Sequence, residues 1–250
     1  MGLNRILEPE VMDSEREAQE YNDMDHSVVN QRFVEELFQF VRDQNAVGAV
    51  GAVGAVGAVG ADGEIDLGDV LDLGTGTALI PIELCRQDHE CRVMAVDLAV
   101  SMLELARYNV EAGGMIERIT LAQVDAKKMG YDRGAFDVVI SNSIIHHIPQ
   151  PLSCLREMVR VVAEDGLLFI RDLMRPEDTE TLEELVVAYT GKESEYSQKL
   201  FRDSLHAALS LDEIRELVAS LGFEPDSVKA TSDRHWTWTA VNLAGVINSE

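Results

Sequence analysis

The pattern of hydrophobic positions predicts one helix followed by alternating strands and helices. Between about Ser27 and Gln44, apolar residues recur at helical intervals, which is typical of a helix with one buried face. From Asp69 onward, short β-rich runs alternate with stretches of helical periodicity, as in a parallel sheet covered on both faces. We expect strands near 69–73, 92–97, 118–122, 136–141 and 167–171, and helices at 78–86, 100–112 and 152–161.

The last third of the chain is predicted to be mainly helical, with helices at 179–189 and 211–221. A polar insert at 192–201 is expected to lie over the active face. A late strand at 236–243 is expected to close the sheet edge as part of a hairpin. Together the elements predict a Rossmann-like three-layer α/β/α sandwich with a mostly parallel seven-stranded sheet and an antiparallel C-terminal strand. We divide the chain into an N-terminal helical lid segment (1–45), an Ala-Val-Gly low-complexity loop (46–62) and the main domain (63–250), which has a helical insert near 178–210. The repetitive loop is interpreted as a tolerated surface insertion, with a partner-binding strand or a hinge as the alternative.

Charge restricts the classes of partner. The chain has 45 acidic and 21 basic residues and a formal net charge of -24, so its surface repels phosphate backbones and anionic membranes. We therefore expect no nucleic-acid or membrane partner and a small or cationic substrate. Its 3 cysteines are widely spaced and are expected to be reduced, and with no signal peptide or membrane-spanning run evident we expect a cytoplasmic protein.

A glycine turn after the first predicted strand is the strongest chemical signal. Gly74 and Gly76 allow the backbone to approach a ligand closely at the start of a helix. A dinucleotide site would need a third glycine at the position of Leu79, and no phosphate-loop lysine follows. Asp72 is unsuited to a pyrophosphate but suits a ligand that carries an ammonium and a sulfonium group.

Acidic residues also follow the second and third predicted strands. Asp97 ends the second strand, where its carboxylate can accept both hydrogen bonds of a ribose diol. Asp125 follows the third strand and could accept from an adenine amino group. A structural role as a helix N-cap is the alternative for both, and for Asp125 the two interpretations stay open.

Four stretches occur in the order found in class I S-adenosylmethionine-dependent methyltransferases, which the chain resembles from about Asp69 to Asp172. These stretches are Asp72-Leu73-Gly74-Thr75-Gly76, Val96-Asp97 with Met102-Leu103, Val124-Asp125-Ala126, and Phe136-Asp137-Val138-Val139 leading to Ser141-Asn142. The pair His146-His147 makes the chain most similar to the small-molecule enzymes of the ubiquinone and menaquinone biosynthesis type. Ala78 and Ala99 stand where relatives often have Gly and Ser, which affects little beyond cofactor affinity.

The resemblance implies S-adenosyl-L-methionine as the cofactor. Gly74 and Gly76 would face its methionine portion, Asp97 its ribose, and Leu98 with Met102 its adenine face. Asp125 would meet the adenine amino group. The full set of expected cofactor-binding residues is Asp72, Gly74, Gly76, Asp97, Leu98, Met102, Asp125, Ala126 and Asn142.

Candidates for the acceptor side follow the fourth and fifth strands. His146 and His147 could serve as a general base, with shaping of the loop as the alternative, and Asp172 is the third catalytic candidate. The expected substrate-binding residues are Tyr21, Arg171, Arg175 and His206. Asn142 and Ser141 stand where metal-dependent O-methyltransferases carry acidic ligands, so no metal is expected.

The predicted function is methyl transfer from S-adenosylmethionine to a small-molecule acceptor by a monomer or homodimer. Two alternatives within the resemblance are a non-catalytic protein that binds S-adenosylmethionine or S-adenosylhomocysteine and a methyltransferase that acts on a protein side chain, since an acidic surface can recruit basic partners. A nucleotide-dependent oxidoreductase is a further alternative, against which the missing third glycine argues.

Overall fold

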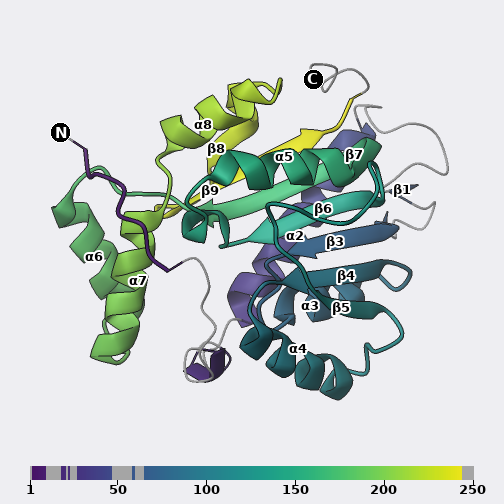
Figure 1. Cartoon of the computed structure of the whole chain (residues 1–250), viewed down its shortest axis with the longest axis horizontal. Helices are drawn as coiled ribbons and strands as arrows, with labels where there is room; N and C mark the ends of the chain where they lie inside the picture. The colour runs from purple at the N-terminus through teal and green to yellow at the C-terminus, as the bar shows by residue number, and fades with distance from the viewer. Residues whose placement is uncertain are drawn as a thin grey trace.

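The computed structural model describes residues 2–9, 18–20, 22, 27–46, 58–59 and 65–243. Its main feature is a 7-stranded sheet with the strand order β5-β4-β3-β6-β7-β9-β8 (Figure 1). The strands are β3 (Asp69–Leu73), β4 (Arg92–Asp97), β5 (Ile119–Gln123), β6 (Phe136–Asn142), β7 (Val162–Leu173), β8 (Val228–Ala230) and β9 (His235–Val241). Strand β9 runs antiparallel to β7 and β8, whereas the pairs from β5 to β7 are parallel. This arrangement confirms the predicted fold class.

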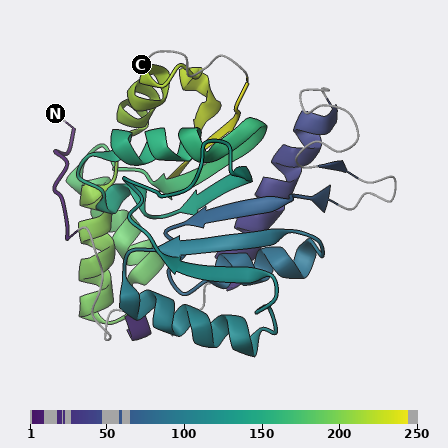
Figure 2. The same ribbon diagram turned by 45° about the vertical axis from the view of Figure 1, so that its right-hand side comes forward.

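Helices cover both faces of the sheet, as Figure 2 shows for α2 and α5 on opposite sides. Helices α2 (Ser27–Ala46), α3 (Leu79–Gln87) and α4 (Val100–Ala112) supply one hydrophobic core, and α5 (Pro151–Val161) and α8 (Leu211–Ser220) supply the other. Helices α6 (Thr179–Thr190) and α7 (Glu195–Ala207) pack on each other beside the end of β7, with the small core of Leu173, Leu182 and Leu205 between them. The predicted polar insert at 192–201 therefore lies mostly in a regular helix.

The bounds of β3, β4 and α4 agree with those predicted from the apolar pattern. Two strands differ. Strand β7 begins five residues before the expected Leu167, at Val162. Strand β8 was not predicted, and it forms the sheet edge in place of β9, which lies between β7 and β8. Trp236 and Trp238 in β9 are fully buried, as expected for two core residues on one face of a strand.

The described residues before the sheet include helix α2 and an N-terminal arm. Helix α2 buries Phe33, Leu37 and Val41 in the core, so it is a structural helix of the sandwich. An N-terminal arm, residues 2–9, lies against the α6 and α7 side of the molecule (Figure 1). Of the Ala-Val-Gly loop, residues 58–59 are described, and they form β1 (Ala58–Val59), which pairs antiparallel with β2 (Ile65–Asp66).

Candidate functional site

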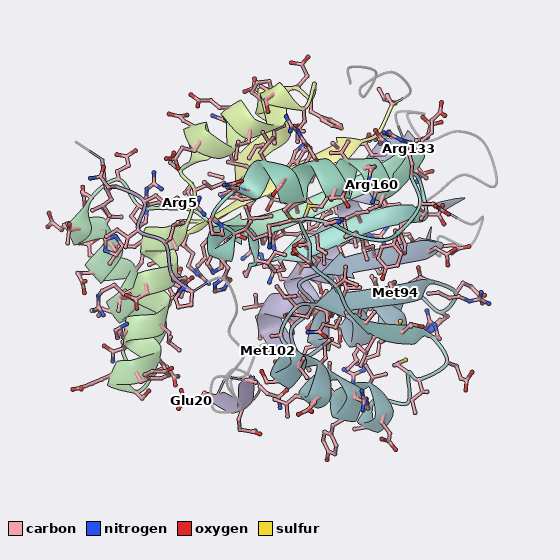
Figure 3. All side chains as sticks on the ribbon, in the orientation of Figure 1. Arg5, Glu20, Met94, Met102, Arg133 and Arg160 are labelled. Atoms are coloured by element: carbon pink, nitrogen blue, oxygen red, sulfur yellow. The ribbon has the colours of Figure 1, made fainter. Side chains whose placement is uncertain are left out.

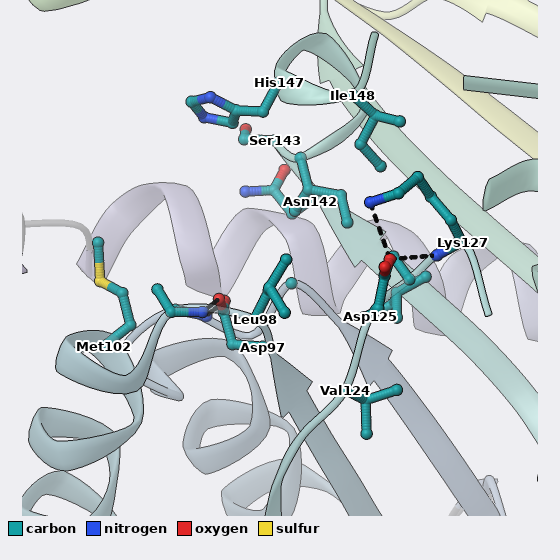
Figure 4. A pocket seen from close by; sticks show the side chains of 16 residues that line it. Asp97, Leu98, Met102, Val124, Asp125, Lys127, Asn142, Ser143, His147 and Ile148 are labelled. Atoms are coloured by element: carbon teal, nitrogen blue, oxygen red, sulfur yellow. Dashed lines mark hydrogen bonds and ion pairs between the residues drawn. The ribbon is translucent and has the colours of Figure 1, made fainter. Parts of the chain in front are cut away.

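The pocket lies at the ends of β3, β4 and β6 and in the loop that follows β5, where open α/β sheets bind ligands (Figure 4). Its wall combines backbone of the glycine turn with polar and apolar side chains. The lining residues are Leu73, Gly74, Gly76, Asp97, Leu98, Ala99, Met102, Val124, Asp125, Ala126, Lys127, Asn142, Ser143, Ile144, His147 and Ile148.

The glycine turn is fixed by its hydrogen bonds to the neighbouring strand. The amides of Gly74 and Thr75 donate to the carbonyl of Val96 at 2.8 and 2.9 Å. Gly74 has a φ of 75°, and a Cβ placed on it would lie 1.9 Å from Cγ2 of Ile144. Glycine is therefore required at position 74 by both the backbone conformation and the close packing of the Ile144 side chain.

Ala78 stands at the N-cap of α3 with a φ of 61°, in the left-handed region that glycine adopts more readily. Ala78 thus carries local backbone strain at the start of α3. Sequence reasoning expected only a small residue at this position.

Asp97 links the glycine turn to the start of α4. Its Oδ2 accepts from the amide of Gly76 at 2.8 Å, and its Oδ1 accepts from the amide of Ala99 at 2.9 Å. Each carboxylate oxygen has a second lone pair, so the side chain can still accept hydrogen bonds from a ligand in the pocket. Asp97 thus combines the N-cap-like role and the ligand-facing position that were considered as alternatives.

Asp125 lies across the pocket from Met102 and forms an ion pair with Lys127 (Figure 4). The Nζ of Lys127 lies 2.9 Å from Oδ1, and the backbone amide of Lys127 donates to the same oxygen at 2.9 Å. Burial opposes ionisation, but these hydrogen bonds outweigh it and lower the pKa of Asp125 below its usual value. The carboxylate is therefore charged and remains a possible acceptor for an amino group.

Asp72 does not line this pocket, although sequence reasoning placed it with the cofactor. It faces an adjoining smaller pocket, together with Asn30, Thr75 and Asn142. The side chain is buried and its Oδ2 has no hydrogen-bond partner in the described residues. Burial, with a further contribution from Asp97, raises the pKa of Asp72 to about 7, against the opposing effect of Thr75.

The histidine pair lies in the short helix η1 (Ile145–His147) after β6, with the two ring centroids 4.1 Å apart. His147 lines the pocket, whereas His146 is buried behind it and its Nδ1 lies 2.5 Å from Oδ1 of Asp172. Burial lowers the pKa of His146, but the attraction of Asp172 and Glu8 outweighs this and raises it. Burial and the neighbouring His146 lower the pKa of His147 to about 3, so His147 is neutral at physiological pH and a weak base.

Asp172 and the two arginines do not line this pocket, although they were predicted on the acceptor side. Asp172 is fully buried and also accepts hydrogen bonds from the amides of Ile145 and Leu173, so it positions His146 instead of meeting a ligand. Arg171 points to the other face of the sheet, where it pairs with Glu36 of α2 and bonds Thr237. Arg175 pairs with Glu213 at 2.7 Å and donates to the carbonyl of Ala208. Both guanidiniums are thus used within the fold.

Of the other two substrate candidates, only His206 lies in the described residues. The ring of His206, in α7, does not line it, and its backbone carbonyl instead accepts from the amide of Ile6. Tyr21 lies outside the described residues. In the same segment, Ala18 packs on Ala99 and Met102 beside the pocket.

The N-terminal arm contributes residues that sequence reasoning did not connect with the site. Nε of Arg5 donates to the carbonyl of Ala207, and its Nη2 donates to the carbonyls of His146 and Ile148, which flank His147. Glu8 reaches both histidines, with Oε1 lying 3.2 Å from Nδ1 of His147. These contacts join segments far apart in the chain, so no local sequence signal indicated them.

Comparisons with known proteins show one family that matches both the fold and the glycine turn of this chain. A family model described as a methyltransferase domain matches residues 66–228. A ubiquinone/menaquinone biosynthesis C-methyltransferase from Citrifermentans bemidjiense is 30% identical over 110 residues, which are 44% of this chain and 47% of that protein. A malonyl-acyl-carrier-protein O-methyltransferase from Geobacter sulfurreducens is 31% identical over 154 residues, covering 62% of this chain and 55% of that protein. The chain thus matches about half the length of these relatives.

A solved structure of a SAM-dependent methyltransferase from Aquifex aeolicus superposes with a TM-score of 0.57 at 17% identity, over 92% of this chain and 99% of that one. At this identity the likeness concerns the fold. Since the family model spans more than half of the residues, including the glycine turn and Asp97, the chain belongs to the methyltransferase-domain family.

Proposed function

We propose that the pocket binds S-adenosyl-L-methionine and that the protein transfers its methyl group to a small-molecule acceptor. The observation that carries the proposal is the Asp97 carboxylate, which faces the pocket beside the glycine turn while backbone amides hold both of its oxygens in place. A carboxylate fixed in this way can accept two hydrogen bonds from a ribose diol without losing side-chain entropy on binding. The membership of the methyltransferase-domain family supports the same cofactor.

The remaining pocket residues suit the rest of the cofactor and an acceptor with an apolar body. Leu98, Met102 and Val124 offer apolar surface for an adenine ring, and Asp125 offers an acceptor for its amino group. Ile144, Ile148 and His147 line the same pocket next to η1. Methyl transfer requires the acceptor atom about 3 Å from the methyl carbon and in line with the sulfur, so the protein contributes mainly by aligning the two reactants and excluding water.

We infer a small-molecule acceptor and a cytoplasmic address, with the protein acting as a monomer or homodimer. The net charge of -24 disfavours nucleic-acid and membrane partners. All 3 cysteines are free and buried, as suits a reducing compartment. None of the helices in the described part of the chain combines the length and apolarity that a membrane crossing requires.

Asp97→Ala tests the proposal. The variant should bind S-adenosylmethionine more weakly by about 1.5–3 kcal/mol, because charge-assisted hydrogen bonds to the ribose are lost. The measurement is calorimetric titration with the cofactor and with S-adenosylhomocysteine. Asp66→Ala is a matched control, since Oδ1 of Asp66 also accepts from the amide two residues later, at 2.9 Å, but outside the pocket. Equal affinities for the parent and Asp97→Ala would remove the ribose assignment.

Turnover is tested separately, by release of S-adenosylhomocysteine with a panel of phenolic, carboxylic, amine and quinol acceptors and with a basic peptide. Product formation with one of the small molecules supports the proposal. Tight cofactor binding without product over the whole panel would instead favour a non-catalytic cofactor-binding protein, and product with the peptide alone would favour action on a protein side chain.

A further inference from the structure

Three side chains from two distant segments meet beside the pocket. Glu8 comes from the N-terminal arm, and His146 and His147 come from η1. Oε1 of Glu8 lies 3.5 Å from Nε2 of His146 and 3.2 Å from Nδ1 of His147. The side chains are only 10%, 4% and 16% exposed, so this polar group is enclosed by protein.

Two atoms of the group lack a hydrogen bond although they are buried. Oε1 of Glu8 and Nδ1 of His147 have no hydrogen-bond partner within the described part of the chain, whereas the other Glu8 oxygen accepts from the hydroxyl of Ser204 at 3.4 Å. A buried polar atom without a partner costs about 1–3 kcal/mol. These two atoms lie 3.2 Å from each other, so one ion between them would be bound by both.

The spacing of the atoms fits a metal ion. Two ligand atoms that bind one zinc ion tetrahedrally, each at about 2.0–2.1 Å, lie about 3.3–3.4 Å apart. The two distances from Glu8 bracket this value, and all three candidate ligand atoms lie within 4.8 Å of one another. Two imidazoles and one carboxylate are a common donor set for a catalytic zinc or non-haem iron site. We infer that Glu8, His146 and His147 bind a divalent first-row transition metal ion, with Zn²⁺ as the representative ion.

The surroundings of His146 support this assignment. Asp172 accepts a hydrogen bond from Nδ1 of His146, which leaves the lone pair of Nε2 directed to the side of Glu8. Metal-bound histidines commonly donate their other ring nitrogen to a carboxylate in this way, which orients the ring and increases its basicity as a ligand. Asp172, which sequence reasoning considered catalytic, thus becomes a positioning residue for a metal ligand.

Arg5 holds the third ligand in position. Its three hydrogen bonds to the carbonyls of Ala207, His146 and Ile148 fasten the arm to the loop that carries both histidines. Glu8, three residues further along the arm, is thereby brought to the ring nitrogens. The ligand set is complete only while the arm is docked.

The site suggests a role that rests on the proposed methyl transfer. His147 lines the cofactor pocket, so the ion would lie next to the place where an acceptor meets the cofactor. Three protein ligands leave a coordination position open. A hydroxyl group of the acceptor bound there would release its proton to water more easily, and the resulting oxyanion, or an acceptor carboxylate, would be aligned to attack the methyl carbon as the bond from that carbon to sulfur breaks and S-adenosylhomocysteine leaves.

The test is metal binding, which is measured without any acceptor. The full chain is stripped with a chelator, dialysed and titrated with Co²⁺, whose visible d–d absorption reports tetrahedral coordination, and Zn²⁺ is then added to displace it. We expect one equivalent of Co²⁺ to bind and Zn²⁺ to remove the absorption. Glu8→Gln and His147→Asn should each weaken binding at least about 100-fold, because loss of a direct ligand should cost at least as much as loss of an outer-shell partner.

Matched variants separate coordination from folding. His206→Asn alters a histidine of α7 next to the same arm but outside the cluster and should leave metal affinity unchanged. Asp172→Asn and Arg5→Ala keep all three ligands and should weaken binding about 10–100-fold. Thermal unfolding in chelator identifies any variant that fails to fold.

Absence of a stoichiometric ion in the parent chain would overturn the metal site, as would equal affinity in the parent and Glu8→Gln. Neither result would affect the proposed function, because cofactor binding and product release are measured independently of the ion. Conversely, if the protein bound one equivalent of metal but had no affinity for the cofactor, the metal site would stand and the proposed methyl transfer would be wrong.

Discussion

Gly74→Ala is expected to lower the free energy of unfolding by about 2–5 kcal/mol and to abolish tight cofactor binding. Two physical costs add at this position. An alanine at the observed φ of 75° is strained by about 1–2 kcal/mol, and its Cβ would overlap Cγ2 of Ile144 at 1.9 Å. Overpacking of this kind costs about 1–3 kcal/mol and would displace Ile144, which lines the pocket.

Gly114→Ala separates the two costs. Gly114 also has a left-handed φ, of 70°, but a Cβ there would meet nothing within 4 Å. This variant should therefore lose only about 1 kcal/mol and bind the cofactor as the parent does. Urea unfolding measures the first effect and calorimetric titration the second. Equal losses of stability in the two variants would show that Ile144 moves aside without cost.

The elements that carry the pocket could be predicted because their apolar runs are strong and their ends are marked. Strand β3 ends in the glycine turn, and β4 ends at Asp97, so both the strands and their ligand-facing tips were apparent. Eight of the nine expected cofactor-binding residues line one pocket, since the carboxyl ends of parallel strands meet at one edge of a sheet. Strand β8, with three residues, is too short for an alternating pattern to show.

The acceptor side was harder to predict because position along a strand does not say which face a side chain takes. Arg171 and Asp172 are neighbours in β7 and must therefore point to opposite faces. Arg171 lies over the rings of Phe33 and Phe169, at 5.6 and 5.7 Å, on the α2 side, while Asp172 faces His146. Arg171 and Asp172 were predicted to contact a ligand because they are charged and lie at a strand end. In the folded protein each of them instead pairs with another side chain.

Glu8 shows a second limit of sequence reasoning. Its segment has no marked periodicity, and its place beside the histidines depends on hydrogen bonds from Arg5 to carbonyl groups in distant loops. Backbone acceptors carry no sequence signature. The arm could therefore be recognised as part of the site only in the folded structure. There, residues 2–9 lie beside α7 and η1, and Arg5 of this arm is labelled in Figure 3.

Asp72→Asn is expected to raise the free energy of unfolding at pH 8 by about 2–4 kcal/mol. The carboxyl group of Asp72 is buried with Oδ2 unpartnered, and burial raises its pKa from 3.8 to about 7. This rise corresponds to an unfavourable free energy of about 4 kcal/mol for the ionised folded state. Asparagine has nearly the same shape and no charge, so it removes that cost.

The stabilisation should depend on pH in a defined direction. Below pH 3.8 the carboxyl group is protonated in both the folded and unfolded chain, so the parent has no penalty there. As the pH rises from 3.8 to about 7, the unfolded chain releases the proton while the folded chain keeps it, and the parent loses stability. The difference between Asp72→Asn and the parent should therefore grow over this window and level off above pH 7.

Cofactor affinity should change in the opposite sense, which explains why a destabilising acid would be kept beside the glycine turn. A carboxylate near the pocket attracts a cationic ligand, so the proposed S-adenosylmethionine should bind the parent more tightly as the pH passes 7 and should bind Asp72→Asn with less dependence on pH. Urea unfolding and calorimetric titration at pH 5, about 6.5 and 8 measure both trends. A variant that is less stable than the parent at pH 8 would show that Asp72 is ionised and well solvated in the folded protein, and the proposed trade between stability and ligand binding at this acid would then be wrong.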